Sequence, residues 1–157
     1  MVDRKDIGSW LEGPGSRAPE SAEYPGERLG LAREGAGSIG RVGRRVLGVL
    51  IDWTLCTLIA FGLFDVPLPF TDTADGGAWI TLAVFAVENL LLVGTLGFTI
   101  GHRVVGLQVR SINGAAARPV QVLVRTVLLC LFLPAMFWDR DGRGLHDKAA
   151  GTVIVRL

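Results

Sequence analysis

The stretch Arg44-Arg45-Val46-Leu47-Gly48-Val49-Leu50-Ile51-Asp52-Trp53 opens the first long apolar run of the chain and carries an aspartate within it. An ionised carboxylate in hydrocarbon costs about 2.5–3.5 kcal/mol on insertion scales, so such a residue is usually neutralised, paired or used. Arg45 lies two helical turns before Asp52, on the same helical face but about 10 Å away along the axis. Asp52 therefore needs a partner from elsewhere in the chain.

The apolar residues are gathered in blocks long enough to cross a membrane. Half of the 157 residues are hydrophobic. As helices, residues 45–64 and 78–97 would each cover about 30 Å, one hydrocarbon thickness. A third block, residues 119–138, is as long but contains Arg125 and Pro134. We expect it to be a full span or a re-entrant helix bent at Pro134. We favour the second, because broken helices are tolerated where protein surrounds them.

Two short segments have the pattern of β-strands. Residues 106–112 alternate apolar and polar side chains and end at the turn-forming pair Asn113-Gly114. Residues 152–155, Thr-Val-Ile-Val, are β-branched, which favours a strand. We expect the two to pair on the cytoplasmic side. The predicted fold class is therefore an all-α membrane protein with two transmembrane helices, a third broken hydrophobic helix and a small cytoplasmic β-hairpin-like element.

The distribution of charge predicts an orientation. Arg41, Arg44 and Arg45 crowd the start of the first block, whereas residues 65–77 carry three aspartates and no positive charge. Because arginine and lysine are enriched on the cytoplasmic side, we expect a cytoplasmic N-terminus. The formal net charge of +1 argues against a nucleic-acid-binding protein.

The N-terminal part of the chain differs in composition from the rest. Residues 1–40 are polar and rich in glycine and proline, so they cannot bury a core alone and are expected to be disordered or bound to a partner. We therefore divide the chain into a leader, residues 1–40, and a membrane domain, residues 41–157.

Three motifs in the membrane domain resemble those of a known family. They are the Arg45-x6-Asp52 pair, the segment TIGHRVVGLQV at residues 99–109 and the segment LHDKAAGTVIV at residues 145–155. Together they resemble the RDD family of bacterial membrane proteins, named for one arginine and two aspartates, which here would be Arg45, Asp52 and Asp147. The resemblance implies a small multi-span protein of the bacterial plasma (inner) membrane, with transport proposed and neither enzyme activity nor a cofactor. His102 departs from the pattern, because the family often has lysine there.

The ionisable side chains within the apolar blocks are Asp52, Glu88 and Arg125, with Arg45 at the membrane rim. Arg125 is the best counter-ion for Asp52, because its guanidinium suits a carboxylate. The remaining carboxylate, Glu88, is then protonated, paired through snorkelling of Arg45, or turned to a cation or a partner subunit. An unpaired carboxylate would be a proton or cation site. We favour a structural role, with Asp52 and Arg125 locking the third block against the first span.

The polar residues outside the spans do not indicate a catalytic or metal-binding site. Asp147 is expected to cap a helical turn or to pair with an arginine such as Arg103. His102 and His146 are expected at the surface, because a metal pair needs more ligands than the sequence offers. We found no phosphate-binding loop, nucleophile triad or zinc motif, so no catalytic, cofactor-binding or metal-binding residue is predicted.

Two functions fit these observations. The favoured one is a non-enzymatic accessory or assembly subunit of a larger inner-membrane complex, with the respiratory chain as a candidate. Its partners would be other membrane subunits, contacted through residues 1–40, and the lipid bilayer. The alternative is an oligomeric proton-coupled ion or solute transporter, suggested by two carboxylates, Asp52 and Glu88, that share one matching arginine, Arg125.

Overall fold

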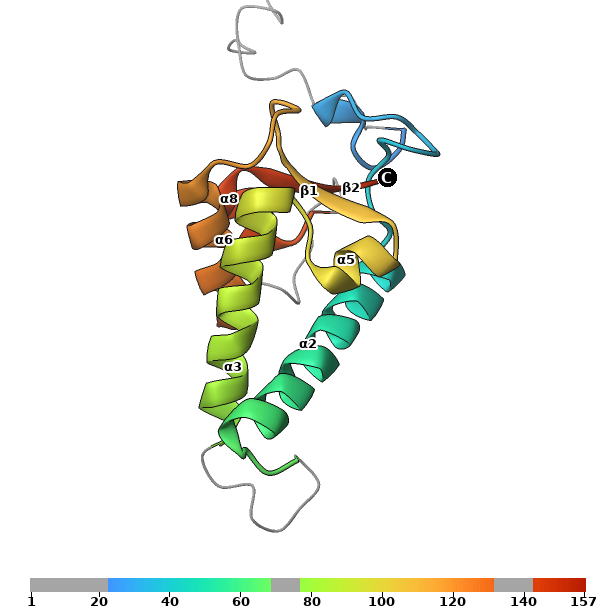
Figure 1. The fold of residues 1–157 in the computed structure, drawn as a ribbon. Coiled ribbons are helices and arrows are strands. Elements are labelled where there is room, and N and C mark those ends of the chain that lie inside the picture. Colours follow the sequence, from blue (N-terminus) through green and yellow to red (C-terminus); the bar gives the residue numbers. More distant parts are fainter. Residues whose placement is uncertain (1–22, 69–76, 132–142) are drawn as a thin grey trace, which may run out of the picture.

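Two long helices lie side by side and extend to one side of a small sheet (Figure 1). In this computed structural model, residues 23–68, 77–131 and 143–157 are described. Helix α2 spans Val42–Phe64. The second long helix, Gly77–Leu96, is continuous through α3 (Gly77–Glu88), the π-helical segment η2 (Asn89–Val93) and α4 (Gly94–Leu96). Both helices begin and end within three residues of the predicted blocks, 45–64 and 78–97.

Both helices are long and apolar enough to cross a membrane. Only 22% of the most apolar window of each is buried within the chain, so most of this surface can meet lipid or another protein. A soluble protein would bury such helices in its core. The prediction of two apolar helices of spanning length is therefore confirmed.

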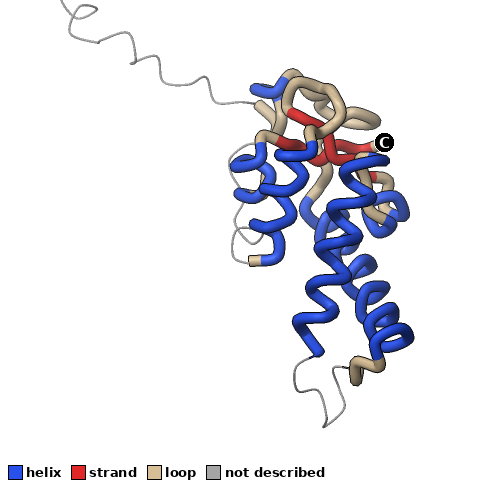
Figure 2. The backbone as a smooth tube through the Cα atoms, turned by 60° about the vertical axis from the view of Figure 1, so that its left-hand side comes forward, coloured by secondary structure: helices blue, strands red, loops and turns tan. Residues whose placement is uncertain are grey.

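The sheet lies at one end of the two long helices, as a second view shows (Figure 2). Strand β1 (Leu107–Ser111) pairs antiparallel with β2 (Thr152–Arg156), with Leu107 opposite Arg156 and Ser111 opposite Thr152. The predicted pairing of the two segments is confirmed, although helices α6 and α8 lie between them in the chain. The sheet is thus closed by a long connection and is no simple hairpin.

The described end of the leader contacts this sheet. Residues 27–29 form a short 3-10 helix, η1 (Glu27–Leu29). Further along, the backbone N–H groups of Gly37 and Gly40 donate to the carbonyls of Arg156 and Ile154, and Arg156 N–H donates to the Ser38 carbonyl. Residues 37–40 therefore cover the edge of β2 that β1 leaves open, which removes exposed backbone donors and acceptors from solvent.

The third apolar block begins as helix α6 (Pro119–Cys130). Proline suits its first position, and the Gln121 side chain accepts from the Arg118 backbone N–H at 2.9 Å. The helix is about 18 Å long, too short to span a bilayer by itself. Residues 132–138, including the predicted bend at Pro134, lie outside the described residues. Helix α8 (Leu145–Ala150) then leads into β2.

Two apolar clusters hold these elements together. One lies between the sheet, η2 and α6; its buried residues are Val93, Leu107, Val109, Ala117, Val122 and Ile154. The other lies between α2, α3 and α6, and consists of Cys56, Phe85 and Leu129. Because α6 contributes to both clusters, it fixes the sheet relative to the long helices.

Candidate functional site

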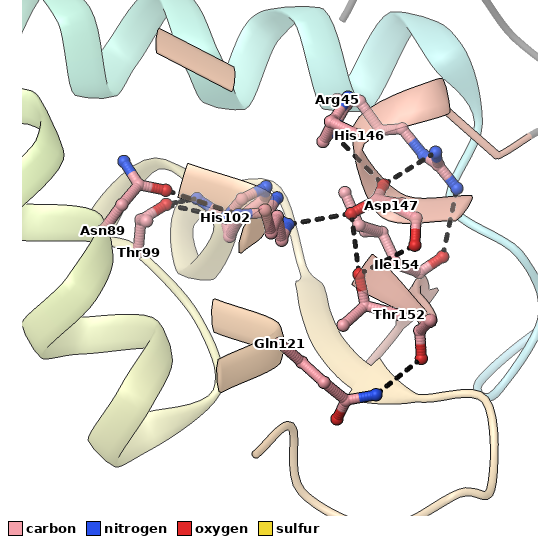
Figure 3. Close-up of polar contacts among 11 residues, drawn as sticks. Arg45, Asn89, Thr99, His102, Gln121, His146, Asp147, Thr152 and Ile154 are labelled. Carbon is pink, nitrogen blue, oxygen red and sulfur yellow. Dashed lines mark hydrogen bonds and ion pairs between the residues drawn. The ribbon is translucent and has the colours of Figure 1, made fainter. Parts of the chain in front are cut away.

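Asp147 is the centre of the first buried polar cluster. It lies in the first turn of α8 and is completely buried. Its Oδ1 accepts a hydrogen bond from Arg125 Nε at 2.8 Å, and its Oδ2 lies 3.7 Å from Arg45 Nη1 and 3.4 Å from His146 Nε2 (Figure 3). The Thr152 hydroxyl also donates to Oδ1, at 3.1 Å. One carboxylate thus joins α2, α6, α8 and β2.

The charges around Asp147 keep it ionised. Burial alone would raise the pKa of this carboxyl, but the positive charge of Arg125, with those of His146 and Arg45, outweighs burial and holds the pKa at about 2. Of the predicted alternatives for Asp147, the helix cap is wrong and pairing with an arginine is confirmed, although the arginines are Arg125 and Arg45 and not Arg103. The carboxylate binds other side chains, and the Arg103 guanidinium lies over the Phe98 ring at 5.4 Å.

Arg125 has a different partner from the one predicted. It is buried on α6, where Nε donates to Asp147 and Nη1 donates to Asn89 Oδ1 at 3.4 Å. The prediction that Arg125 pairs with Asp52 is therefore wrong. The reason is topological, because α8 places Asp147 beside Arg125, whereas Asp52 is bound by the cap and first turn of α5. The π-helical segment starts at Asn89, which is consistent with π-helical turns occurring at functional positions.

Arg45 is buried at the start of α2. Its Nε donates to the Gly40 carbonyl at 2.9 Å and its Nη2 donates to the Ile154 carbonyl at 3.3 Å. These bonds and the contact with Asp147 attach α2 to the sheet. Arg45 and Asp147 therefore form a structural link, separate from Asp52.

Asp52 belongs to a second polar cluster, farther along α2. It is 1% exposed and accepts two hydrogen bonds from the short helix α5 (Ile100–Val104) and its cap. The Thr99 hydroxyl donates to Oδ2 at 2.5 Å, and the Gly101 backbone N–H donates to Oδ1 at 2.6 Å. A hydroxyl and a main-chain N–H thus take the place of the arginine that was predicted as the partner of Asp52.

The close approach of α5 to α2 depends on glycine. A Cβ on Gly101 would overlap the Gly48 carbonyl oxygen and would lie 2.8 Å from the Asp52 carboxylate. Only a residue without a side chain lets the Gly101 N–H reach Asp52. The Thr99 side chain also caps α5, because its oxygen accepts from the His102 backbone N–H at 3.1 Å. The sequence contained this signal as a threonine preceding Ile-Gly-His.

Glu88 lies beside Asp52. The Cys56 thiol donates to Glu88 Oε2 at 3.0 Å, whereas Oε1 is buried with no hydrogen-bond partner among the described residues. The Asp52 and Glu88 carboxyls are close enough to interact electrostatically. Within the described segments, neither forms an ion pair with a basic side chain. Arg125, whose charge acts on Asp52, gives its hydrogen bonds to Asp147 and Asn89.

His102 completes the second cluster. Its side chain is 2% exposed, and its Nδ1 lies 2.7 Å from the Thr99 hydroxyl oxygen. Burial, with the nearby charge of Arg125, lowers the pKa of His102 to about 3, so the ring is neutral at physiological pH. The prediction of surface histidines is wrong, since His102 and His146 are both buried. No spacing pattern marked them as buried, because their burial depends on long-range packing.

The five residues singled out from the sequence thus fall into two clusters. Arg45, Arg125 and Asp147 form one, and Asp52 with Glu88 forms the other. In residues 23–68, 77–131 and 143–157 there is no group of three or more histidine, cysteine, aspartate or glutamate residues that could hold a metal ion. Four residues that contact the two clusters were not predicted as site residues: Asn89, Thr99, Gly101 and Thr152.

A comparison with protein-family models gives one match. The model described as RDD family matches residues 39–151, which include both clusters and most of the chain. Neither curated proteins nor solved structures give a match.

Proposed function

The chain belongs to the RDD family, and from this premise we propose that it acts as an oligomeric, proton-coupled ion or solute transporter in a membrane. Asp52 and Glu88 would carry the proton. The observation that supports this proposal is a pair of neighbouring carboxyls inside apolar helices with no basic side chain bonded to either of them in the described chain. Membrane proteins rarely hold unpaired acidic groups at such positions unless they use them.

The chemistry of the pair favours exchange of a proton. Two adjacent carboxyls in apolar surroundings repel each other when both are ionised, so they share protons and titrate as a unit. Asp52 is held by two neutral donors, Thr99 and Gly101, which solvate a negative charge without cancelling it. Such a site can release its proton and accept a cation in its place, which is the elementary step of proton-coupled transport.

The position of the pair along the helices also supports the proposal. Asp52 is the eleventh of the 23 residues of α2, about 15 Å from its first residue. Glu88 is the twelfth residue of the helix Gly77–Leu96. If both helices span the bilayer, the two carboxyls lie near its midplane, where transporter binding sites are commonly found.

A transport path requires more than one copy of the chain. The two helices of spanning length in residues 23–68, 77–131 and 143–157 cannot surround a polar path, and the described helix α6 is too short to complete one. The large exposed apolar side chains of α2 and α3 offer a surface for self-association. We therefore expect a homo-oligomer in which several Asp52–Glu88 pairs line the path.

We further propose the bacterial plasma (inner) membrane as the location, with the N-terminus in the cytoplasm. Arg41, Arg44 and Arg45 lie at the sheet end of α2, and Asp65 lies just past its other end. This asymmetry follows the positive-inside rule and would place the sheet on the cytoplasmic side.

The transport proposal is tested with purified protein in sealed vesicles that contain a pH-sensitive dye. Imposed gradients of Na⁺, K⁺ and Li⁺ should drive proton movement in the wild type, and Asp52→Asn and Glu88→Gln should abolish it. Asp65→Asn is the matched control, because this residue lies outside the pair and its backbone φ of 52° suits asparagine. Wild-type flux in Asp52→Asn would remove Asp52 from the mechanism. Absence of flux in the wild type under all three gradients would contradict proton-coupled cation transport.

A second candidate is an accessory or assembly subunit of a larger inner-membrane complex. It is favoured by the exposed apolar surface of the two spanning-length helices in the described part of the chain, which other subunits could cover as readily as lipid. Residues 1–40 would then contact a partner. Purification in mild detergent through a tag on this chain distinguishes the two. Stoichiometric foreign subunits would support the accessory role, whereas recovery of the chain with itself alone would count against it.

A further inference from the structure

A continuous line of hydrogen bonds connects Asp52 with a buried histidine. The Thr99 hydroxyl lies 2.5 Å from Asp52 Oδ2 on one side and 2.7 Å from His102 Nδ1 on the other. All three side chains are buried, each at 2% exposure or less. The far nitrogen of the ring, His102 Nε2, is buried and has no hydrogen-bond partner in the described residues. A buried polar atom without a partner needs an explanation, and a role in proton movement is one.

The same heavy-atom positions fit two arrangements of protons. In the first, Asp52 is ionised, Thr99 donates to it, and His102 carries its proton on Nδ1 and donates to the Thr99 oxygen. In the second, Asp52 is protonated and donates to Thr99, Thr99 donates to Nδ1, and the histidine proton is on Nε2. The His102 backbone N–H donates to the same oxygen in both. The hydroxyl therefore has one donor bond and two acceptor bonds in each arrangement, its full capacity.

We propose that Asp52, Thr99 and His102 form a proton relay in which the imidazole changes tautomer and stays neutral throughout. When a proton binds Nε2, the N–H bond at Nδ1 breaks and that proton moves to the Thr99 oxygen. The original hydroxyl proton moves to Asp52 Oδ2 at the same time. One proton enters and one carboxylate is neutralised, so charge and atoms balance. As a supply route for the carboxyl pair, the relay rests on the transport function proposed above.

The surroundings of the relay favour a neutral ring. The charged and titratable groups that act on His102 come from three elements: Arg45 on α2, Arg125 on α6, and Asp147 with His146 on α8. Burial and the positive charges of Arg125 and Arg45 both oppose a further positive charge on the ring. Asp52 faces Glu88 on α3, which can pass a proton on or receive one, and the Cys56 thiol bonds to Glu88. His102 thus transfers protons between its two ring nitrogens without becoming positively charged.

The direct test is the tautomer of His102. The full chain, with ¹⁵N-labelled histidine, is placed in lipid nanodiscs, and the nitrogen NMR shifts are followed from pH 5 to pH 10. A protonated and an unprotonated imidazole nitrogen differ widely in shift, and a His102→Asn variant identifies the signals of His146, the other histidine of the chain. We expect His102 to carry its proton on Nδ1 at high pH and on Nε2 at low pH, with no doubly protonated form.

Three variants make the test specific. Asp52→Asn should hold His102 in the Nε2–H form at every pH, because its amide N–H donates to Thr99 while its oxygen accepts from Gly101. Thr99→Ser, which keeps the hydroxyl, should keep the pH-dependent change. Thr99→Asn keeps a good helix cap but has no hydroxyl to transfer a proton, so it should abolish the change.

The outcomes separate the relay from the transport function. A tautomer that does not change with pH in the wild type, or that changes equally in Asp52→Asn or Thr99→Asn, would overturn the relay. If proton flux is present, Thr99→Asn should slow it by about 10²-fold or more, the typical contribution of a positioned proton-transfer group. Unslowed flux would also overturn the relay. A pH-dependent tautomer in a protein without flux would leave the relay standing and would refute the transport function.

Discussion

Replacing Asp147 with asparagine tests whether the buried cluster at the sheet holds the fold together. The carboxylate is completely buried and is the only acidic group that pairs with Arg45 and Arg125 in the described chain. Asp147→Asn would remove the negative charge that lies against the buried guanidinium groups of Arg125 and Arg45. Breaking one buried ion pair costs about 3–5 kcal/mol because the remaining charge is uncompensated. We expect a loss at the upper end of this range, since two charges are affected.

Replacing the two arginines should cost less stability than replacing Asp147, and the two losses should differ. Arg125→Met removes the 2.8 Å hydrogen bond to Asp147 but leaves Arg45 as a counter-charge, so its cost should be smaller than that of Asp147→Asn. Arg45→Met removes a 3.7 Å contact and two bonds to carbonyls, and should cost less again. For a chain of this size, about 3–5 kcal/mol corresponds to a fall in melting temperature of roughly 6–20 °C.

The assay uses a cysteine of the chain as the reporter. Cys56 is 0% exposed, so a thiol-reactive dye labels it only on unfolding, and a Cys130→Ala background removes the partly exposed second thiol. Asp65→Asn serves as control and should stay within about 0.5 kcal/mol of its parent, as exposed substitutions usually do. If Asp147→Asn and Arg125→Met have the same melting temperature as this control, the buried cluster around Asp147 does not stabilise the fold.

Three further predictions concern packing, pH and topology. Gly101→Ala should destabilise the protein by about 1–3 kcal/mol through overpacking. Gly62→Ala, whose added methyl group meets open space on α2, should leave the melting temperature of the protein unchanged or raise it. If both variants melt at the same temperature, the close approach of α5 to α2 is refuted. Because the pKa of His102 is about 3 in the fold and near 6.5 when unfolded, the unfolded chain binds more protons between these values. The free energy of unfolding should therefore fall as pH drops below about 6.5, by up to about 1.4 kcal/mol per pH unit, and the melting temperature should fall with it. His102→Asn should flatten this pH dependence, and an unchanged slope would argue against a buried neutral ring. In a cysteine-free background, Glu34→Cys and Leu157→Cys should both be shielded from a membrane-impermeant maleimide in intact cells and be labelled in inside-out vesicles, whereas opposite labelling of the two would break the proposed topology.

The sequence was sufficient to predict the two long helices and the two strands because their signals are local. Apolar blocks of spanning length predicted the helices at residues 42–64 and 77–96, and alternation with β-branched residues predicted the two strands. These patterns depend on neighbours within a few turns of helix or along one strand. For the third block, only its first part, α6, is described.

The pairings were harder to predict because they depend on how distant segments pack. Arg125 was assigned to Asp52 by charge counting, but α8 places Asp147 against it. Asp52 is bound by the Thr99 hydroxyl and the Gly101 backbone N–H, two neutral donors that a count of charges does not detect. The burial of His102 has no local signature. Charge inventory therefore identified the polar residues but not their partners.

The most direct test of the account is the infrared spectrum of the full chain in lipid at neutral pH. Exposed acidic residues are ionised there, so a protonated carboxyl C=O band reports on buried groups. If the Asp52–Glu88 pair carries a proton, this band should be present in the wild type, and Asp52→Asn and Glu88→Gln should each shift or remove it, while Asp65→Asn leaves it unchanged. A wild-type spectrum with ionised carboxylates alone would contradict the account.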